Sequence, residues 1–116
     1  MRRAEVGTAA EGIAADYLAR RGLVIVTRNF RTRHGEIDLI ARDGDTLVFV
    51  EVRMRSRADY GGAAASVTAR KRERLIAASL GYLRAIGREP PCRFDAVLLD
   101  RLDPARVEWL RDVVEA

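Results

Sequence analysis

Cysteine, histidine and lysine are almost absent from this chain of 116 residues, which contains one of each: Cys92, His34 and Lys71. A single cysteine cannot form an internal disulfide, and Cys92 has no cysteine or histidine partner at metal-ligand spacing. The sequence therefore indicates a protein of a reduced compartment.

Long hydrophobic runs are also lacking, since no stretch approaches the roughly 20 apolar residues needed to cross a bilayer. Arg2 and Arg3 resemble the start of a twin-arginine export signal, but the acidic residues Glu5 and Glu11 follow and no apolar segment does. We therefore expect a cytoplasmic protein with no membrane partner. The length fits one domain, residues 1–116.

Positive charge is concentrated in one segment of the chain. Residues 53–74 contain seven basic and two acidic residues, 7 − 2 = +5, whereas the remainder carries 14 − 15 = −1. Clustered basic groups favour phosphate binding because they release condensed counterions, although a solvated helix face has the same composition. The basic residues are Arg53, Arg55, Arg57, Arg70, Lys71, Arg72 and Arg74.

Hydrophobic periodicity predicts two helices and four strands. The helices are expected over Ala4–Arg21 and from a cap at Thr68 to about Ile86, and the strands over Leu23–Phe30, Glu36–Ala41, Thr46–Arg53 and Cys92–Leu99. This α-β-β-β-α-β order predicts an α/β fold with a mixed sheet. Residues 54–65, rich in Arg, Gly and Ala, are expected to form a mobile loop, and residues 107–114 fit either a short helix or a strand.

The turn between the second and third strands decides whether Asp38 and Glu51 lie on one face. A two-residue turn at Asp43-Gly44 or Gly44-Asp45 places them on the same face, whereas a three-residue turn places them on opposite faces. Glu51 and Arg53 point the same way. The valines between and before them, Val48, Val50 and Val52, line the other face.

Two carboxylates and a backbone carbonyl suit a hard cation such as Mg²⁺ or Mn²⁺. Glu11, at the margin of the first helix's apolar stripe, is a candidate third acid. Residue pattern alone leaves a simpler alternative, because acids on half-buried strands usually face solvent.

The segments Gly-Glu-Ile-Asp-Leu-Ile at 35–40 and Phe-Val-Glu-Val-Arg at 49–53 resemble the YraN family of bacterial proteins, which is related to restriction-endonuclease-like nucleases and archaeal Holliday junction resolvases. The resemblance covers nearly the whole chain. It extends to Glu11, Asn29, Arg31, Arg55, Gly61, Val67, Lys71 and Arg93-Phe94-Asp95.

This resemblance implies a restriction-endonuclease-like core in which Asp38 and Glu51 bind the metal and Glu11 supports them. Arg53 stands where the nuclease pattern usually has lysine. Arginine keeps its charge, so it can orient water or neutralise phosphate but cannot act as a base. Because all other basic residues are arginine, the one lysine, Lys71, is a candidate for contact with phosphate or metal.

Arg93 and Asp95 share a face of the last predicted strand, and the resemblance places them beside the acids. We expect them to support the site through a bidentate pair rather than to take part in catalysis.

The leading hypothesis is a Mg²⁺-dependent nuclease acting on DNA, with shaped or branched DNA favoured over a base sequence. Arg53 acts with the catalytic acids, and Arg55, Arg57, Arg70, Lys71, Arg72 and Arg74 contact the phosphate backbone. Two alternatives remain open: a catalytically inactive nucleic-acid-binding accessory protein of the same fold, and an interaction module without a nucleic acid partner. Analogy with junction-cutting enzymes also suggests a homodimer.

Overall fold

The computed structural model of the chain describes residues 2–54 and 69–113. Most of the expected loop 54–65 and the expected cap Thr68 lie outside the described residues. The elements are, in order, α1 (Arg3–Arg20), β1 (Val24–Thr32), β2 (Gly35–Asp43), β3 (Thr46–Met54), α2 (Ala69–Ile86), β4 (Cys92–Leu99) and β5 (Val107–Leu110).

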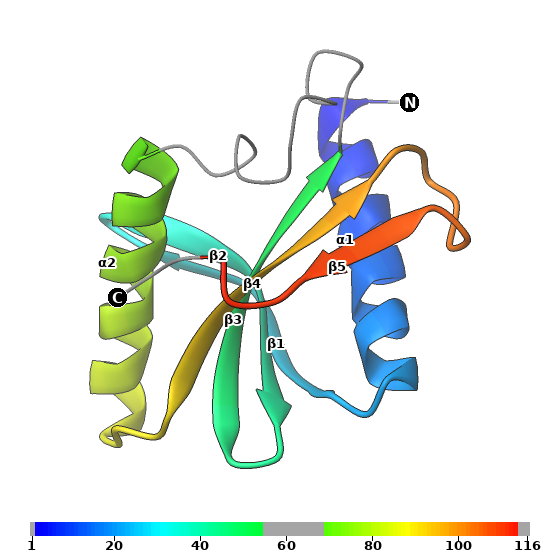
Figure 1. The fold of residues 1–116 in the computed structure, drawn as a ribbon. Helices are drawn as coiled ribbons and strands as arrows, with labels where there is room; N and C mark the ends of the chain where they lie inside the picture. Colours follow the sequence, from blue (N-terminus) through cyan, green and yellow to red (C-terminus); the bar gives the residue numbers. More distant parts are fainter. Residues whose placement is uncertain (1, 55–68, 114–116) are drawn as a thin grey trace.

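The strands form one sheet in the order β1-β2-β3-β4-β5. All neighbours are antiparallel except β3 and β4, which are parallel and therefore need a crossover connection. Helix α2 lies in that crossover, and α1 covers the opposite face of the sheet (Figure 1). The predicted α/β fold with a mixed sheet is confirmed, and the segment left open near the C-terminus contains a fifth strand.

Helix α1 ends where the sequence predicts, at a glycine. Gly22 adopts a φ of +95°, a left-handed conformation that a residue with a Cβ rarely adopts. The Gly22 N–H donates to the Ala19 carbonyl and the Leu23 N–H donates to the Leu18 carbonyl. These two bonds satisfy carbonyls that the helix leaves free and direct the chain into β1.

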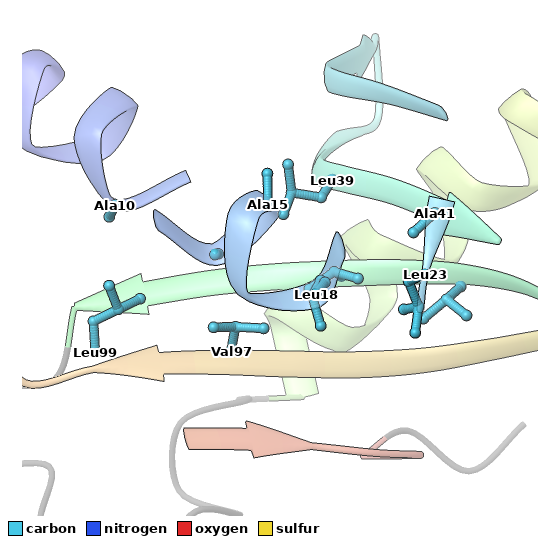
Figure 2. Close-up of a cluster of buried hydrophobic side chains, with 11 residues drawn as sticks. Ala10, Ala15, Leu18, Leu23, Leu39, Ala41, Val97 and Leu99 are labelled. Atoms are coloured by element: carbon cyan, nitrogen blue, oxygen red, sulfur yellow. The ribbon is translucent and has the colours of Figure 1, made fainter. Parts of the chain in front are cut away.

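Each helix buries its own face of the sheet. The cluster under α1 contains alanines and Leu18 from the helix, Leu39 and Ala41 from β2, and Val97 and Leu99 from β4 (Figure 2). Val48, Val50 and Val52 of β3 face this cluster, as predicted. The cluster under α2 is built from Ile37, Ile40, Leu47, Phe49, Leu75 and Ala78.

The hairpins are longer than the sequence suggested. Strand β1 continues past Phe30 to Thr32, where Arg31 pairs with Glu36 and Thr32 with Gly35. This pairing is made by backbone groups, so the side-chain pattern did not predict it. The Thr32 hydroxyl accepts hydrogen bonds from the N–H groups of His34 and Gly35 and so stabilises the turn. Met54 was expected in the loop, but it pairs with Leu99 and ends β3.

Within the described ranges, neither helix combines the length and apolar character that crossing a bilayer requires.

Candidate functional site

The β2–β3 hairpin has the two-residue turn on which the site depends. Asp43 pairs with Thr46 and Leu39 with Val50, which leaves Gly44 and Asp45 as the turn. Gly44 has a φ of +61°, as the first central residue of a type II′ turn requires. Continued by one step, this register sets Asp38 opposite Glu51.

At the end of this ladder, the Asp38 carboxylate accepts a hydrogen bond from a backbone N–H of β3, as a main-chain carbonyl does within the ladder. Its Oδ2 accepts a hydrogen bond of 2.8 Å from the Val52 N–H. A side chain thus bridges the two strands just beyond their last paired residues, which holds Asp38 against β3 beside Glu51.

Asp38 and Glu51 open into one pocket of about 100 Å³ beneath the start of α2. Lys71 of α2 reaches into it, with its Nζ 3.6 Å from Glu51 Oε1; the two side chains are 41% and 20% exposed. A cation therefore already faces one of the two acids. This acidic pocket is lined by Glu36, Asp38, Glu51, Lys71, Arg74 and Leu75.

Burial raises the pKa of Asp38 from 3.8 to about 7. The hydrogen bond from Val52 opposes this shift, and the negative charges of Glu51, Glu11 and Glu36 add to it. The charges of three other carboxylates therefore act on Asp38. Such a concentration of negative charge is typical of a site that receives a cation.

Glu11 approaches this group from α1 and is half-buried. Burial raises its pKa, whereas a hydrogen bond from the Asn29 side chain lowers it. Asn29 lies between the pairs Arg28–Leu39 and Phe30–Ile37, so it faces Asp38 across the β1–β2 ladder, and it has a left-handed φ of +52°. Sequence reasoning placed Glu11 at the sheet but did not find the role of Asn29. Its sequence signals were its place among the residues of the family resemblance and the tolerance of asparagine for this conformation.

Asp38 and Glu51, the two predicted metal ligands, both line the pocket. Among residues 2–54 and 69–113, no group of three His, Cys, Asp or Glu side chains is close enough to hold a metal ion together. Two carboxylates nevertheless fit Mg²⁺, which usually retains several waters and takes only one or two carboxylates from a protein.

The predicted phosphate-binding residues fall into two groups. Arg70, Arg72 and Arg74 are exposed on the first turns of α2, and Arg53 is half-buried on β3 two residues after Glu51. Arg55 and Arg57 lie outside the described residues. Glu36 was not singled out as a site residue, although its place two positions before Asp38 on the same strand was a usable signal.

Arg93 and Asp95 form the expected bidentate pair, with Nε–Oδ1 and Nη2–Oδ2 distances of 2.9 and 3.0 Å. Fully buried Asp95 also accepts hydrogen bonds from the Trp109 indole and the Asp112 N–H, and Arg93 donates to Asp43.

The expected position of this pair beside the acids is wrong. Asp95 pairs with Val50, whose side chain faces α1, whereas Glu51 lies on the other face. In parallel strands, paired residues point to the same side, so Asp95 is directed away from the pocket. The pair ties β4 to the β2–β3 turn and to β5.

Comparison with known families gives a match over residues 10–99 to the model described as "Uncharacterised protein family UPF0102". The chain belongs to this family. Among its relatives, a UPF0102 protein of Methylobacillus flagellatus is 50% identical over 97% of this chain and 98% of its own length. A relative from Dechloromonas aromatica is 53% identical over 95% and 88%, and one from Cupriavidus metallidurans is 53% identical over 94% and 80%.

Membership of UPF0102 confirms the resemblance to the YraN family. The matched region begins inside α1, one residue before Glu11, and ends with the last residue of β4. It therefore contains every residue of the acidic pocket and the Arg93–Asp95 pair, whereas β5 and its Trp109 lie beyond it.

Proposed function

We propose that this protein is a metal-dependent nuclease that hydrolyses phosphodiester bonds in DNA, built on a restriction-endonuclease-like core. The observation that carries the proposal is the convergence of Asp38 and Glu51, from adjacent strands, with Lys71 from α2 in one small pocket. Carboxylates can hold a metal ion that activates water, and a nearby cation can stabilise the charge that develops on phosphate during hydrolysis.

Asp38 and Glu51 would hold the Mg²⁺ or Mn²⁺ ion. When bound, that ion supplies a Lewis acid and lowers the pKa of coordinated water. The hydrogen bond from Val52 orients Asp38, so the carboxylate is positioned before any ligand arrives. Glu11 acts on Asp38 through its charge and is a supporting acid rather than a pocket residue.

The chain's cations complement the charge that develops on the reacting phosphate. Lys71 and Arg74 line the pocket from α2, and Arg53 follows Glu51 on β3. Lysine can exchange a proton whereas arginine cannot, so we assign proton transfer to Lys71 and charge neutralisation to Arg53 and Arg74. Phosphate contacts from α2 make the protein sensitive to DNA shape rather than to base sequence.

The test is cleavage of labelled duplex, single-stranded and four-way-junction DNA with Mg²⁺ or Mn²⁺. We expect Asp38→Asn and Glu51→Gln to abolish cleavage and weaken metal binding. The matched controls Asp45→Asn and Glu89→Gln remove exposed acids outside the pocket and should leave both unchanged. Failure to cut any of the three substrates, with unaltered metal affinity in the two pocket variants, would sink the nuclease proposal.

Arg53 favours a second candidate, a nucleic-acid-binding accessory protein of the same fold that performs no hydrolysis. An arginine that cannot release its proton lies two residues after Glu51, where the nuclease pattern usually has lysine. This candidate predicts DNA binding that persists in EDTA, falls steeply with salt and is lost when Arg70, Lys71, Arg72 and Arg74 are neutralised. It also predicts no cleavage under any metal condition.

A further inference from the structure

The turn between β1 and β2 lies directly against α2. A Cβ added at Gly35 would overlap the Arg74 carbonyl oxygen, so only glycine permits this approach. Further along the helix, a Cβ on Gly81 would lie 3.1 Å from Thr32 Cγ2. The Phe30 ring meets Tyr82 edge-to-face, with centroids 5.2 Å apart. The outer end of the hairpin is therefore docked along α2 rather than projecting freely.

This docking joins two sets of arginines that are distant in the sequence. Arg31 and Arg33 are exposed at the β1–β2 turn, and Arg70 and Arg74 are exposed on α2. The contact between Gly35 and Arg74 holds the two sets beside each other. The acidic pocket is lined from both segments, by Glu36 of the hairpin and Arg74 of the helix.

Arg31 forms only a weak, exposed ion pair with Glu36. Arg31 Nε lies 3.4 Å from Glu36 Oε2, but the two side chains are 73% and 54% exposed. Exposed ion pairs contribute little to stability, so a phosphate can compete for the guanidinium. Arg31 also lowers the pKa of Glu11 through its charge, which places it near the acidic group that surrounds Asp38.

We propose that Arg31 and Arg33 form a second phosphate-binding arm, which contacts the backbone of duplex DNA together with Arg70 and Arg74. In this arrangement the DNA backbone runs over the acidic pocket and contacts arginines of both the β1–β2 turn and α2. This inference rests on the proposed function, because it names the surface by which the same site holds its substrate. Arginine is suited to such contacts because its planar group forms paired hydrogen bonds to phosphate.

The test compares two double variants by fluorescence anisotropy on labelled duplex DNA in EDTA, over a series of salt concentrations. Arg31→Gln/Arg33→Gln removes the proposed arm. Arg84→Gln/Arg88→Gln removes the same charge from exposed positions at the far end of α2 and beyond it. We expect roughly tenfold weaker binding from the first variant, with the salt slope reduced by about 2, and less than about threefold from the second.

Glu36→Gln supplies an internal control, since it breaks the same ion pair while keeping Arg31. It removes a negative charge, so DNA binding should stay equal or become tighter. Weaker binding by Glu36→Gln would show that the ion pair, and not the arginine, matters, and would overturn the inference.

Two further outcomes separate this inference from the proposed function. If the wild-type protein binds DNA and the two double variants weaken binding equally, the turn is no phosphate-binding arm, while the nuclease proposal stands. If the wild-type protein binds no DNA even at low salt, both proposals fall.

Discussion

Two opposing effects act on the charged form of Asp38: a backbone hydrogen bond favours it, and its surroundings disfavour it. Its carboxylate is held by the Val52 N–H in a place where burial and three neighbouring acids disfavour its charge. Polar groups arranged in this way reduce stability in the absence of a ligand, and they are retained where a ligand compensates.

The stability of the protein should therefore depend on pH through Asp38. Its folded-state pKa of about 7 lies above the ordinary 3.8, so between these values the folded protein holds a proton that the unfolded chain has released. The free energy of unfolding then falls as pH rises through this window. Asp38→Asn keeps an acceptor for Val52 and should exceed wild type in stability at pH 8 by roughly 1–4 kcal/mol.

Urea denaturation in EDTA at pH 4.5 and pH 8 measures this effect. The advantage of Asp38→Asn should shrink at pH 4.5, where the folded wild type is protonated at this position. Asp45→Asn, at the exposed turn of the same hairpin, should stay within about 0.5 kcal/mol of wild type at both pH values. An equal gain for Asp38→Asn at both pH values would contradict the assignment.

Asp95 is a structural carboxylate, by contrast. It is fully buried and is satisfied by Arg93, Trp109 and the Asp112 backbone. Asp95→Ala leaves half-buried Arg93 with Asp43 alone and removes the acceptor of the Trp109 indole and the Asp112 N–H. It should lower the free energy of unfolding by about 3–5 kcal/mol. Asp103→Ala, which removes a half-exposed acid 3.9 Å from Arg106, should cost less than about 1 kcal/mol. Chemical denaturation measures the free energy of unfolding of both variants. Equal losses would mean that the buried hydrogen bonds of Asp95 do not stabilise the fold more than an exposed ion pair does.

The β1–β2 hairpin depends on the absence of a side chain at Gly35. Gly35→Ala forces the turn away from the Arg74 carbonyl and should cost about 1–3 kcal/mol of stability. Gly12→Ala is the matched control, because a Cβ on Gly12 meets nothing within 4 Å and alanine favours the helix, so stability should rise by up to about 1 kcal/mol. Thermal unfolding followed by circular dichroism distinguishes them, and a neutral Gly35→Ala would show that the hairpin does not need this close approach.

The two helices position the site from opposite faces of one sheet. α1 brings Glu11 toward Asp38 through its contact with Asn29, and α2 brings Lys71 to Glu51. The β2–β3 ladder ends at the Leu39–Val50 pair, and Asp38 and Glu51 lie just beyond it. The site therefore depends on the packing of both clusters as well as on the hairpin itself.

For the whole molecule, a cation that binds only the folded state must raise its stability. Mn²⁺ at a hundred times its Kd should add about 2.7 kcal/mol to the free energy of unfolding, and EDTA should reverse the gain. Asp38→Asn and Glu51→Gln should abolish the metal-induced increment, whereas Glu89→Gln should retain it. Differential scanning calorimetry measures the increments. An increment that survives in both pocket variants would mean that the metal binds elsewhere.

Local sequence patterns predicted six of the seven elements, and they limited the register of the acidic pair to the alternatives set by the β2–β3 turn. Apolar spacing located α1, α2 and β4, and Gly22 ended α1, because these features depend on residues within a few positions of one another. The two-residue turn at Gly44 and Asp45 was among the predicted alternatives, and it carries Asp38 and Glu51 to the same pocket.

The contacts between segments that are distant in the sequence became visible in the folded chain alone. The approach of Lys71 to Glu51, the contact of Gly35 with Arg74 and the direction of Asp95 away from the pocket each join segments that are far apart in the chain. Such contacts are set by how α2 crosses from β3 to β4 and how the β1–β2 hairpin lies against it. No local pattern of residues encodes those arrangements, because they arise from burying both faces of the sheet at once.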